Sequence, residues 1–144
     1  TDAGLAPARG DDPKRVTPAG VPAYVNSDHG TSSFDNRSDD KGPEPEGLTI
    51  GRVGGRSYAF IGLERIGGVA IFELSVPRRP RFVSYTNTRD FAGDPEADTA
   101  GDLGPEGITF IAASDSPIRI PLLAVANEVS GSTTLFAVIS RKRN

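Results

Sequence analysis

A segment built around Pro-Glu-Gly occurs twice in this chain, and this repetition constrains the fold more than any other feature. Segment 45–49 reads Pro-Glu-Gly-Leu-Thr, and segment 105–109 reads Pro-Glu-Gly-Ile-Thr. Further along, segment 63–67 (Leu-Glu-Arg-Ile-Gly) matches segment 127–131 (Asn-Glu-Val-Ser-Gly), at a slightly longer spacing. The extra residues of the second unit fall in the polar stretch 112–121, where a loop can absorb them. Self-similarity at such a spacing indicates a repeat architecture.

Short apolar or alternating runs separated by Gly and Pro predict antiparallel strands in both units. We predict strands at 48–50, 58–63, 69–74 and 81–86 in the first unit and at 108–111, 122–126 and 134–139 in the second. Four short strands in each repeat are typical of a β-propeller blade. We therefore predict an all-β fold with two four-stranded antiparallel blade units, the second incomplete. A compact β-sandwich is the alternative, because its strands would look similar.

The repeat also predicts how the chain divides and what it associates with. The expected parts are an extended, loop-rich or partly disordered lead-in (1–41), blade unit 1 (42–86), an acidic inter-blade loop (87–103), blade unit 2 (104–139) and a basic tail (140–144). Propellers typically close with at least four blades, and repeat units bury their cores only against neighbours. We therefore expect the chain to associate with the remainder of a parent propeller or with itself.

Composition excludes several functional classes. The net charge is −3 and no basic face is evident, so we expect no nucleic-acid partner. The chain has no Cys and a single His, which excludes thiol catalysis, Cys-based zinc sites and multi-histidine metal sites. His29 lies in a polar stretch and is expected at the surface. No apolar run approaches the ~18 residues of a membrane-spanning helix, so no membrane span is expected.

Four glutamates occupy repeated positions and are the candidate metal ligands. Glu46 and Glu106 begin the first strand of each unit, where a propeller directs side chains toward its central channel. Glu64 and Glu128 follow the second strand, near one mouth of the blade. Carboxylates gathered in this way repel one another unless protons or a cation intervene. Calcium accepts six to eight oxygen ligands, and Asn127 adds an amide oxygen, so we predict a calcium site formed by these five residues.

Two alternatives to this calcium site stay open. Each glutamate could instead accept hydrogen bonds from backbone N–H groups or pair with Lys41, Arg65 or Arg89. The loop 87–103 holds five acidic residues and is a second calcium candidate, although it lacks the spacing of an EF-hand. A solvated loop is the favoured interpretation of that segment.

Several strings in the chain resemble one protein family. These strings are 38–47, 59–68, 87–91, 101–107 and 126–131. Together they resemble the choice-of-anchor I proteins, bacterial relatives of the mesenchyme-specific cell-surface glycoproteins of biomineralising animals. The resemblance spans about residues 34–138. It implies a secreted or surface-attached protein with a large propeller-like domain, of which this chain would be the C-terminal blades.

The resemblance implies two functions from different classes. Family members are often labelled alkaline-phosphatase-like or phytase-like, which implies a calcium-binding, metal-dependent phosphoester hydrolase acting on a phosphorylated small molecule. Lys41, Arg65 and Arg89 are then the candidate phosphate-binding residues, since phosphoryl transfer needs cations near the transferred group. The alternative is a non-enzymatic surface or matrix module that binds calcium, mineral or a protein partner. No residue of this sequence is assigned a catalytic role.

Overall fold

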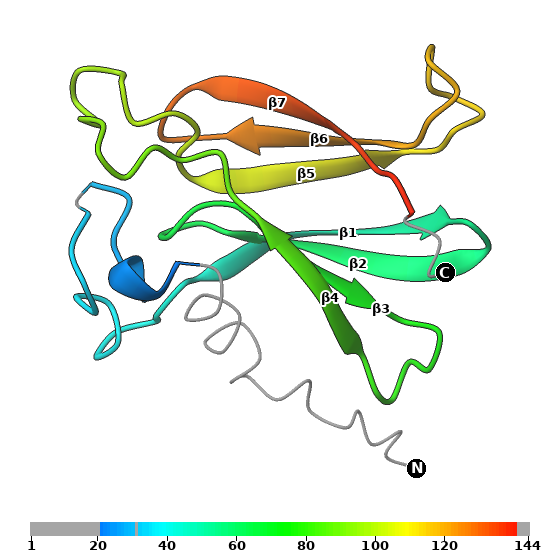
Figure 1. Cartoon of the computed structure of the whole chain (residues 1–144), viewed down its shortest axis with the longest axis horizontal. Helices are drawn as coiled ribbons and strands as arrows, with labels where there is room; N and C mark the ends of the chain where they lie inside the picture. The colour runs from blue at the N-terminus through cyan, green and yellow to red at the C-terminus, as the bar shows by residue number, and fades with distance from the viewer. Residues whose placement is uncertain (1–20, 31, 141–144) are drawn as a thin grey trace.

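The computed structural model of the chain describes residues 21–30 and 32–140, which form two antiparallel β-sheets (Figure 1). The first sheet has the order β1-β2-β3-β4 and consists of β1 (Pro45–Val53), β2 (Arg56–Leu63), β3 (Val69–Glu73) and β4 (Arg81–Thr86). The second has the order β5-β6-β7 and consists of β5 (Pro105–Ile111), β6 (Leu122–Asn127) and β7 (Ser132–Ala137). The predicted all-β class and the two antiparallel units are confirmed. Strand β1 extends beyond the predicted 48–50 at both ends.

Glycine pairs occur in both turns of the first three strands. Gly54 and Gly55 form the two-residue turn between β1 and β2 with φ values of 57° and 81°, and Gly67 and Gly68 end the longer turn before β3 with φ values of 88° and 80°. In the two-residue turn, two successive residues with positive φ match the right-handed twist of the flanking strands, and glycine reaches this conformation without steric cost. The hairpins therefore form where the sequence predicted turns.

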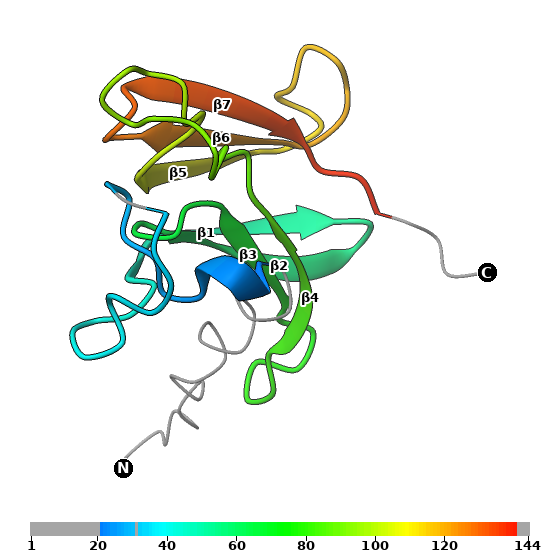
Figure 2. The ribbon, with the colours of Figure 1, turned by 60° about the vertical axis from the view of Figure 1, so that its left-hand side comes forward.

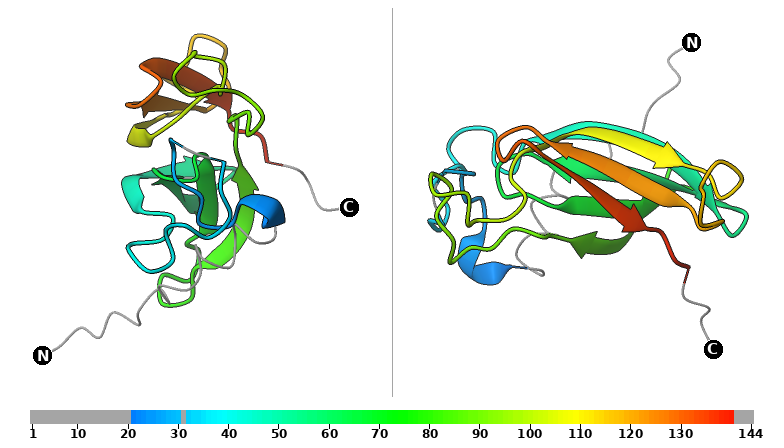
Figure 3. Two further views of the ribbon diagram at one scale, coloured as in Figure 1. Left: turned by 90° about the vertical axis from the view of Figure 1, so that its left-hand side faces the viewer. Right: turned by 90° about the horizontal axis from the view of Figure 1, so that it is seen from above.

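The second sheet lies over the first, with β5 stacked on β1 and β2 (Figures 2 and 3). The rings of Phe60 and Phe110 stack between the sheets with centroids 5.6 Å apart. Leu123 and Val125 of β6 join Phe60 and Val69 in the buried core of this interface. Since sheets bury one face against another element, this shared core is what holds the two units together.

The two sheets use opposite faces in this interface. In the first sheet the side facing the second sheet carries Phe60 and Val69, which we call the facing side, whereas Ala59 and Phe72 belong to a separate core on the outer side. In the second sheet, Leu123 and Phe136 pack in the shared core, although the repeat makes them the equivalents of Ala59 and Phe72. The outer-side positions of one unit thus pack on the facing side of the other. This is a head-to-tail relation rather than a symmetric one.

The lead-in segment covers part of the outer side of the first sheet. A 3-10 helix (η1, Pro22–Tyr24) forms in this segment, and Pro22 at its first position favours it because the fixed φ of proline suits a helical turn. Val21 packs against the outer core, and the rings of Tyr24 and Phe91 stack with centroids 4.1 Å apart. Residues 1–20 of the predicted lead-in and 141–144 of the predicted tail lie outside the described residues.

Two stacked sheets do not close a ring, so the propeller predicted from the repeat is not seen in residues 21–30 and 32–140. The second sheet has three strands, and residues 138–140 form no further strand beside β7. The lead-in, the turns that follow β2 and β6 and the loop 87–104 all gather at one end of the sheets (Figure 1). This end also contains the repeated glutamates. Among the described residues, no helix is long and apolar enough to span a membrane.

Candidate carboxylate site

Glu46 and Glu106 occupy the same irregularity at the start of β1 and β5. Pro45 pairs with Leu63 and Pro105 pairs with Asn127, and in each strand the register shifts immediately afterwards. A β-bulge of this kind re-aims a side chain at the edge of a sheet. Both glutamates are exposed at this end of their strands. The repeat seen in the sequence is therefore also a repeat of local backbone structure.

A matching pair of backbone hydrogen bonds fixes Glu64 and Glu128. The Glu64 N–H donates to the Glu44 carbonyl at 2.9 Å, and the Glu128 N–H donates to the Gly104 carbonyl at 2.8 Å. Glu44 and Gly104 each precede the proline that begins the first strand of their unit. Each unit thus ties the residue after its second strand to the residue before its first strand. This places the second glutamate of the unit beside the bulge that carries the first.

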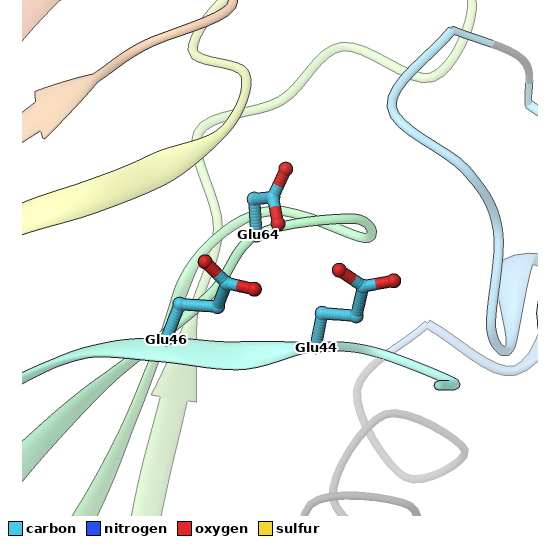
Figure 4. A group of neighbouring side chains, drawn as sticks. All are labelled: Glu44, Glu46 and Glu64. Carbon is cyan, nitrogen blue, oxygen red and sulfur yellow. The ribbon is translucent and has the colours of Figure 1, made fainter. Parts of the chain in front are cut away.

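The carboxylates of the first unit converge. Oxygens of Glu44, Glu46 and Glu64 can be chosen that all lie within 4.8 Å of one another (Figure 4). Burial raises the pKa of Glu64, and the charges of Glu46 and Glu44 raise it further, against the opposing effect of Arg65. The structure therefore brings Glu46 and Glu64 together, as the repeat predicted.

The second unit adds two further glutamates, Glu106 and Glu128, near this cluster. A hydrogen bond and the charge of Glu128 raise the pKa of Glu106, and burial, Glu46 and Glu64 contribute in the same direction. A shallow pocket lies beside this pair and is lined by Glu106, Asn127, Glu128 and Ser132. Glu106 therefore lies close enough to the other three repeated glutamates for each of them to raise its pKa. Carboxylates held together in this way share protons, bind a cation or pair with cationic side chains.

Glu44 belongs to this cluster, although the sequence analysis did not select it. Its side chain is 2% exposed and forms ion pairs with Arg37 at 2.5 Å, Arg65 at 3.3 Å and Lys41 at 3.8 Å. Burial opposes its ionisation, but hydrogen bonds from Arg65 and Arg37 hold its pKa below the usual range. Its φ of 46° is one that glycine adopts easily, and Gly104 has a φ of 70° at the equivalent position. The sequence did contain one sign of this role, because the first unit has a charged residue, Glu44, where the second unit has Gly104.

The candidate phosphate-binding residues Lys41 and Arg65 lie at this end of the sheets but differ in their exposure and in their ion pairs. Lys41 is 68% exposed, with Nζ 3.8 Å from Glu44. Arg65 is 22% exposed, pairs with Glu64 at 3.2 Å and with Glu44, and bonds His29 Nδ1 at 2.8 Å. His29 was expected at the surface, yet its side chain is only 26% exposed. Burial lowers the pKa of His29, and Asp28 opposes this effect.

Arg89 supports the lead-in. It is buried, and its guanidinium donates to the carbonyl oxygens of Asp28 at 2.9 Å, His29 at 3.3 Å and Arg65 at 3.2 Å. It also lies over the ring of Phe91, 4.6 Å from the centroid. Burial lowers the pKa of Arg89. These contacts tie the acidic loop to the lead-in and to the turn after β2, so this side chain has a structural role.

Asn127 and the loop 87–103 are joined by a network of side-chain hydrogen bonds. The Asn127 amide donates to the hydroxyls of Ser132 at 3.1 Å and Thr134 at 3.2 Å. Both hydroxyls in turn donate to Asp102, at 2.7 Å and 2.5 Å, and Thr88 donates to Asp102 at 2.7 Å. Asp102 thus fastens the end of the loop to β7. Sequence reasoning missed this role, because hydroxyls this far apart in the chain gave no pattern.

Comparisons with known proteins agree with the resemblance found in the sequence. The family model described as "Choice-of-anchor I domain" matches residues 9–77, and the match suggests a surface-associated module. The chain is 32% identical over 114 residues to Gigasin-3a from Magallana gigas. That alignment covers 75% of this chain and 40% of the relative, so the chain spans less than half of the relative's length. No solved structure gives a significant match.

Proposed function

We propose that this chain is part of a larger β-propeller of a secreted or surface-attached choice-of-anchor I protein, in which it binds calcium without catalysing a reaction. The head-to-tail packing of the two units supports the propeller. When the outer side of one unit packs on the facing side of the next, a stack of two units leaves one outer side and one facing side without a partner. Only a closed ring or a filament of such units gives every side a partner. A symmetric sandwich would not need the outer-side positions of one unit to meet the facing side of the other.

The observation that carries the binding function is the cluster of Glu44, Glu46 and Glu64, whose carboxylate oxygens lie within 4.8 Å of one another, with Glu106 and Glu128 of the second unit near it. The raised pKa values of Glu64 and Glu106 mean that the folded protein holds these charges at a cost. A divalent cation bound among them relieves that repulsion. Calcium suits the site because it accepts several carboxylate oxygens in flexible geometry.

The contacts of the cationic side chains favour a binding module over a phosphoester hydrolase. A hydrolase needs cations that can meet the transferred phosphate. Arg65 is paired with Glu44 and Glu64, and Arg89 donates to three backbone carbonyls. Only Lys41, of the three candidates, is largely exposed.

A thermal-shift titration tests the proposal. A ligand bound only by the native state raises the Tm by mass action, so millimolar calcium should raise the Tm and EDTA should reverse the effect. Glu46→Gln and Glu106→Gln should each reduce the shift. Glu96→Gln removes one charge from an exposed position in the acidic loop and should leave the shift intact.

Two outcomes would count against this assignment. An unchanged Tm in calcium, with EDTA also without effect, would remove the support for a cation site. Calcium-dependent turnover of p-nitrophenyl phosphate or phytate by the full-length protein, lost in Glu106→Gln, would show that the site is catalytic rather than a binding site alone.

A further inference from the structure

Two large apolar side chains lie uncovered on the outer side of the first sheet. Leu48 and Ile50 of β1 are each 61% exposed. Leu48 pairs with Ile61 and Ile50 pairs with Ala59, so they extend the outer core across the sheet to β1. Large apolar side chains that lie together on one face of a strand normally pack against a partner. The lead-in contributes Val21 to this core, yet Leu48 and Ile50 remain exposed.

The equivalent side chains of the second unit show how such residues pack. Ile108 and Phe110 occupy the positions that match Leu48 and Ile50 in the repeat, and they insert between the sheets. A Cβ atom added to Gly51 would lie 2.3 Å from the Phe110 ring, and one added to Gly62 would lie 2.5 Å from the Pro105 carbonyl oxygen and 3.0 Å from Ile108 Cδ1. Gly51 therefore forms the hollow that receives Phe110, and Gly62 makes room for the Pro105 backbone and the end of Ile108.

We infer that Leu48 and Ile50 insert in the same way into a third blade unit of the parent protein, one with glycine at the positions equivalent to Gly51 and Gly62. The inference rests on the proposed propeller and adds the docking side, the inserted side chains and the composition of the receiving unit. The relative Gigasin-3a is longer than this chain, since the alignment covers 40% of it, and so has room for further units.

The second unit of another copy does not fit this role. Its positions equivalent to Gly51 and Gly62 are occupied by Ile111 and Ala126. The extra side-chain atoms would fill the hollow that Ile50 needs, because Phe110 leaves no space for even a Cβ atom at Gly51. The residues at these two positions therefore indicate that Leu48 and Ile50 dock on a unit other than β5–β7.

Cross-linking in the full-length protein identifies the occupant directly. A photoreactive phenylalanine analogue is placed at position 50, and the cross-linked peptide is mapped by mass spectrometry. We expect a link to a strand of another unit that carries glycine at the Gly51 and Gly62 positions. A link to residues 1–20, a link between two copies, or no link at all would overturn the inference.

A second measurement uses variants that keep the strand propensity of β1. Leu48→Thr combined with Ile50→Thr should lower the Tm of the full-length protein by about 5 °C. The same pair should leave the 144-residue chain nearly unchanged, because both side chains are exposed there. Val76→Thr is the matched control, since Val76 is 58% exposed in a connection outside the sheets.

Equal effects in the two proteins would show that the pair stabilises only the first unit and would refute the docking. These readouts do not depend on calcium. If calcium does not change the Tm but the cross-link maps to a glycine-bearing strand of another unit, only the calcium-binding function is refuted. If calcium binds but the cross-link maps to any other segment, only the docking is refuted.

Discussion

Glu106 and Glu128, which follows the neighbouring strand β6, lie side by side in the lining of one pocket, and the proximity of Glu128 raises the pKa of Glu106. Two neighbouring carboxylates repel each other, and a proton on one of them relieves the repulsion. Glu46 and Glu64 of the other unit add to the effect. The folded protein thus favours proton uptake at Glu106 and at Glu64, whose pKa values are both raised.

Removing one charge from this pair should stabilise the calcium-free protein. Glu128→Gln keeps a hydrogen-bonding group beside Glu106 but abolishes the repulsion, so the Tm in EDTA at neutral pH should rise. The folded pKa of Glu106 is raised, so native stability falls as the pH rises through that pKa. The advantage of the variant should therefore shrink between about pH 7 and pH 4.

The control for this prediction is Glu96→Gln, which removes the same charge from an exposed loop position. It should show neither the gain nor its dependence on pH. A loss of stability in Glu128→Gln at neutral pH would mean that the Glu128 carboxylate makes favourable contacts, contrary to the repulsion described here. Thermal melts in EDTA across this pH range decide between the two.

Loss of the Glu44 charge should have the opposite effect. Glu44→Gln leaves Arg37 and Arg65 without their shared buried partner, which should cost about 3 kcal/mol of unfolding free energy. Asp40→Asn, at a position 50% exposed and also paired with Arg37, should cost about 1 kcal/mol or less. Urea denaturation measures both. Equal losses would mean that Glu44 contributes no more than a surface ion pair.

The same carboxylate predicts sensitivity to acid. Burial opposes ionisation of Glu44, but Arg65 and Arg37 hold its pKa below the ordinary value. A group with a depressed folded pKa stabilises the native state above its unfolded pKa and loses that contribution as the pH falls. Wild-type protein should therefore lose stability more steeply than Glu44→Gln below about pH 4. Parallel curves for the two proteins would contradict this.

The repeated sequence predicted the strands and the positions of Glu46, Glu64, Glu106 and Glu128 at strand ends, because both depend on local order. Alternation and glycine pairs set β2 and β3, and the Pro-Glu-Gly segments set the bulges at Glu46 and Glu106. The ion pairs of Glu44 could not be predicted in this way, because Arg37 and Arg65 meet it only after the lead-in folds back over the turn. The repeat did contain a clue, since Glu44 stands where the second unit has Gly104.

The interface between the sheets depends on the absence of a side chain at Gly51. A Cβ atom at this position would lie 2.3 Å from the Phe110 ring, so Gly51→Ala should cost about 1–3 kcal/mol through overpacking. Phe110→Leu removes part of the ring and should cost less in the Gly51→Ala background than alone. This favourable coupling is measured with a double-mutant cycle. Gly30→Ala, where nothing lies within 4 Å, is the control and should be neutral.

Additive effects in that cycle would show that Gly51 and Phe110 do not limit each other's volume. They would also weaken the docking inferred for Ile50, because that inference takes the same contact as its pattern. The double-mutant cycle therefore tests the Gly51–Phe110 contact, on which the docking proposed for Ile50 in the parent protein is based.

Asp102 should control the order of the acidic loop. Its carboxylate accepts hydrogen bonds from the hydroxyls of Ser132, Thr134 and Thr88, and these bonds outweigh burial and lower its pKa. Asp102→Asn replaces one acceptor oxygen by a donor, so unfolding free energy should fall by about 1–3 kcal/mol and proteases should cleave 87–103 faster. Asp98→Asn removes the same charge at an exposed position and should change neither measurement. Equal cleavage rates in the two variants would show that charge, rather than attachment to β7, orders the loop.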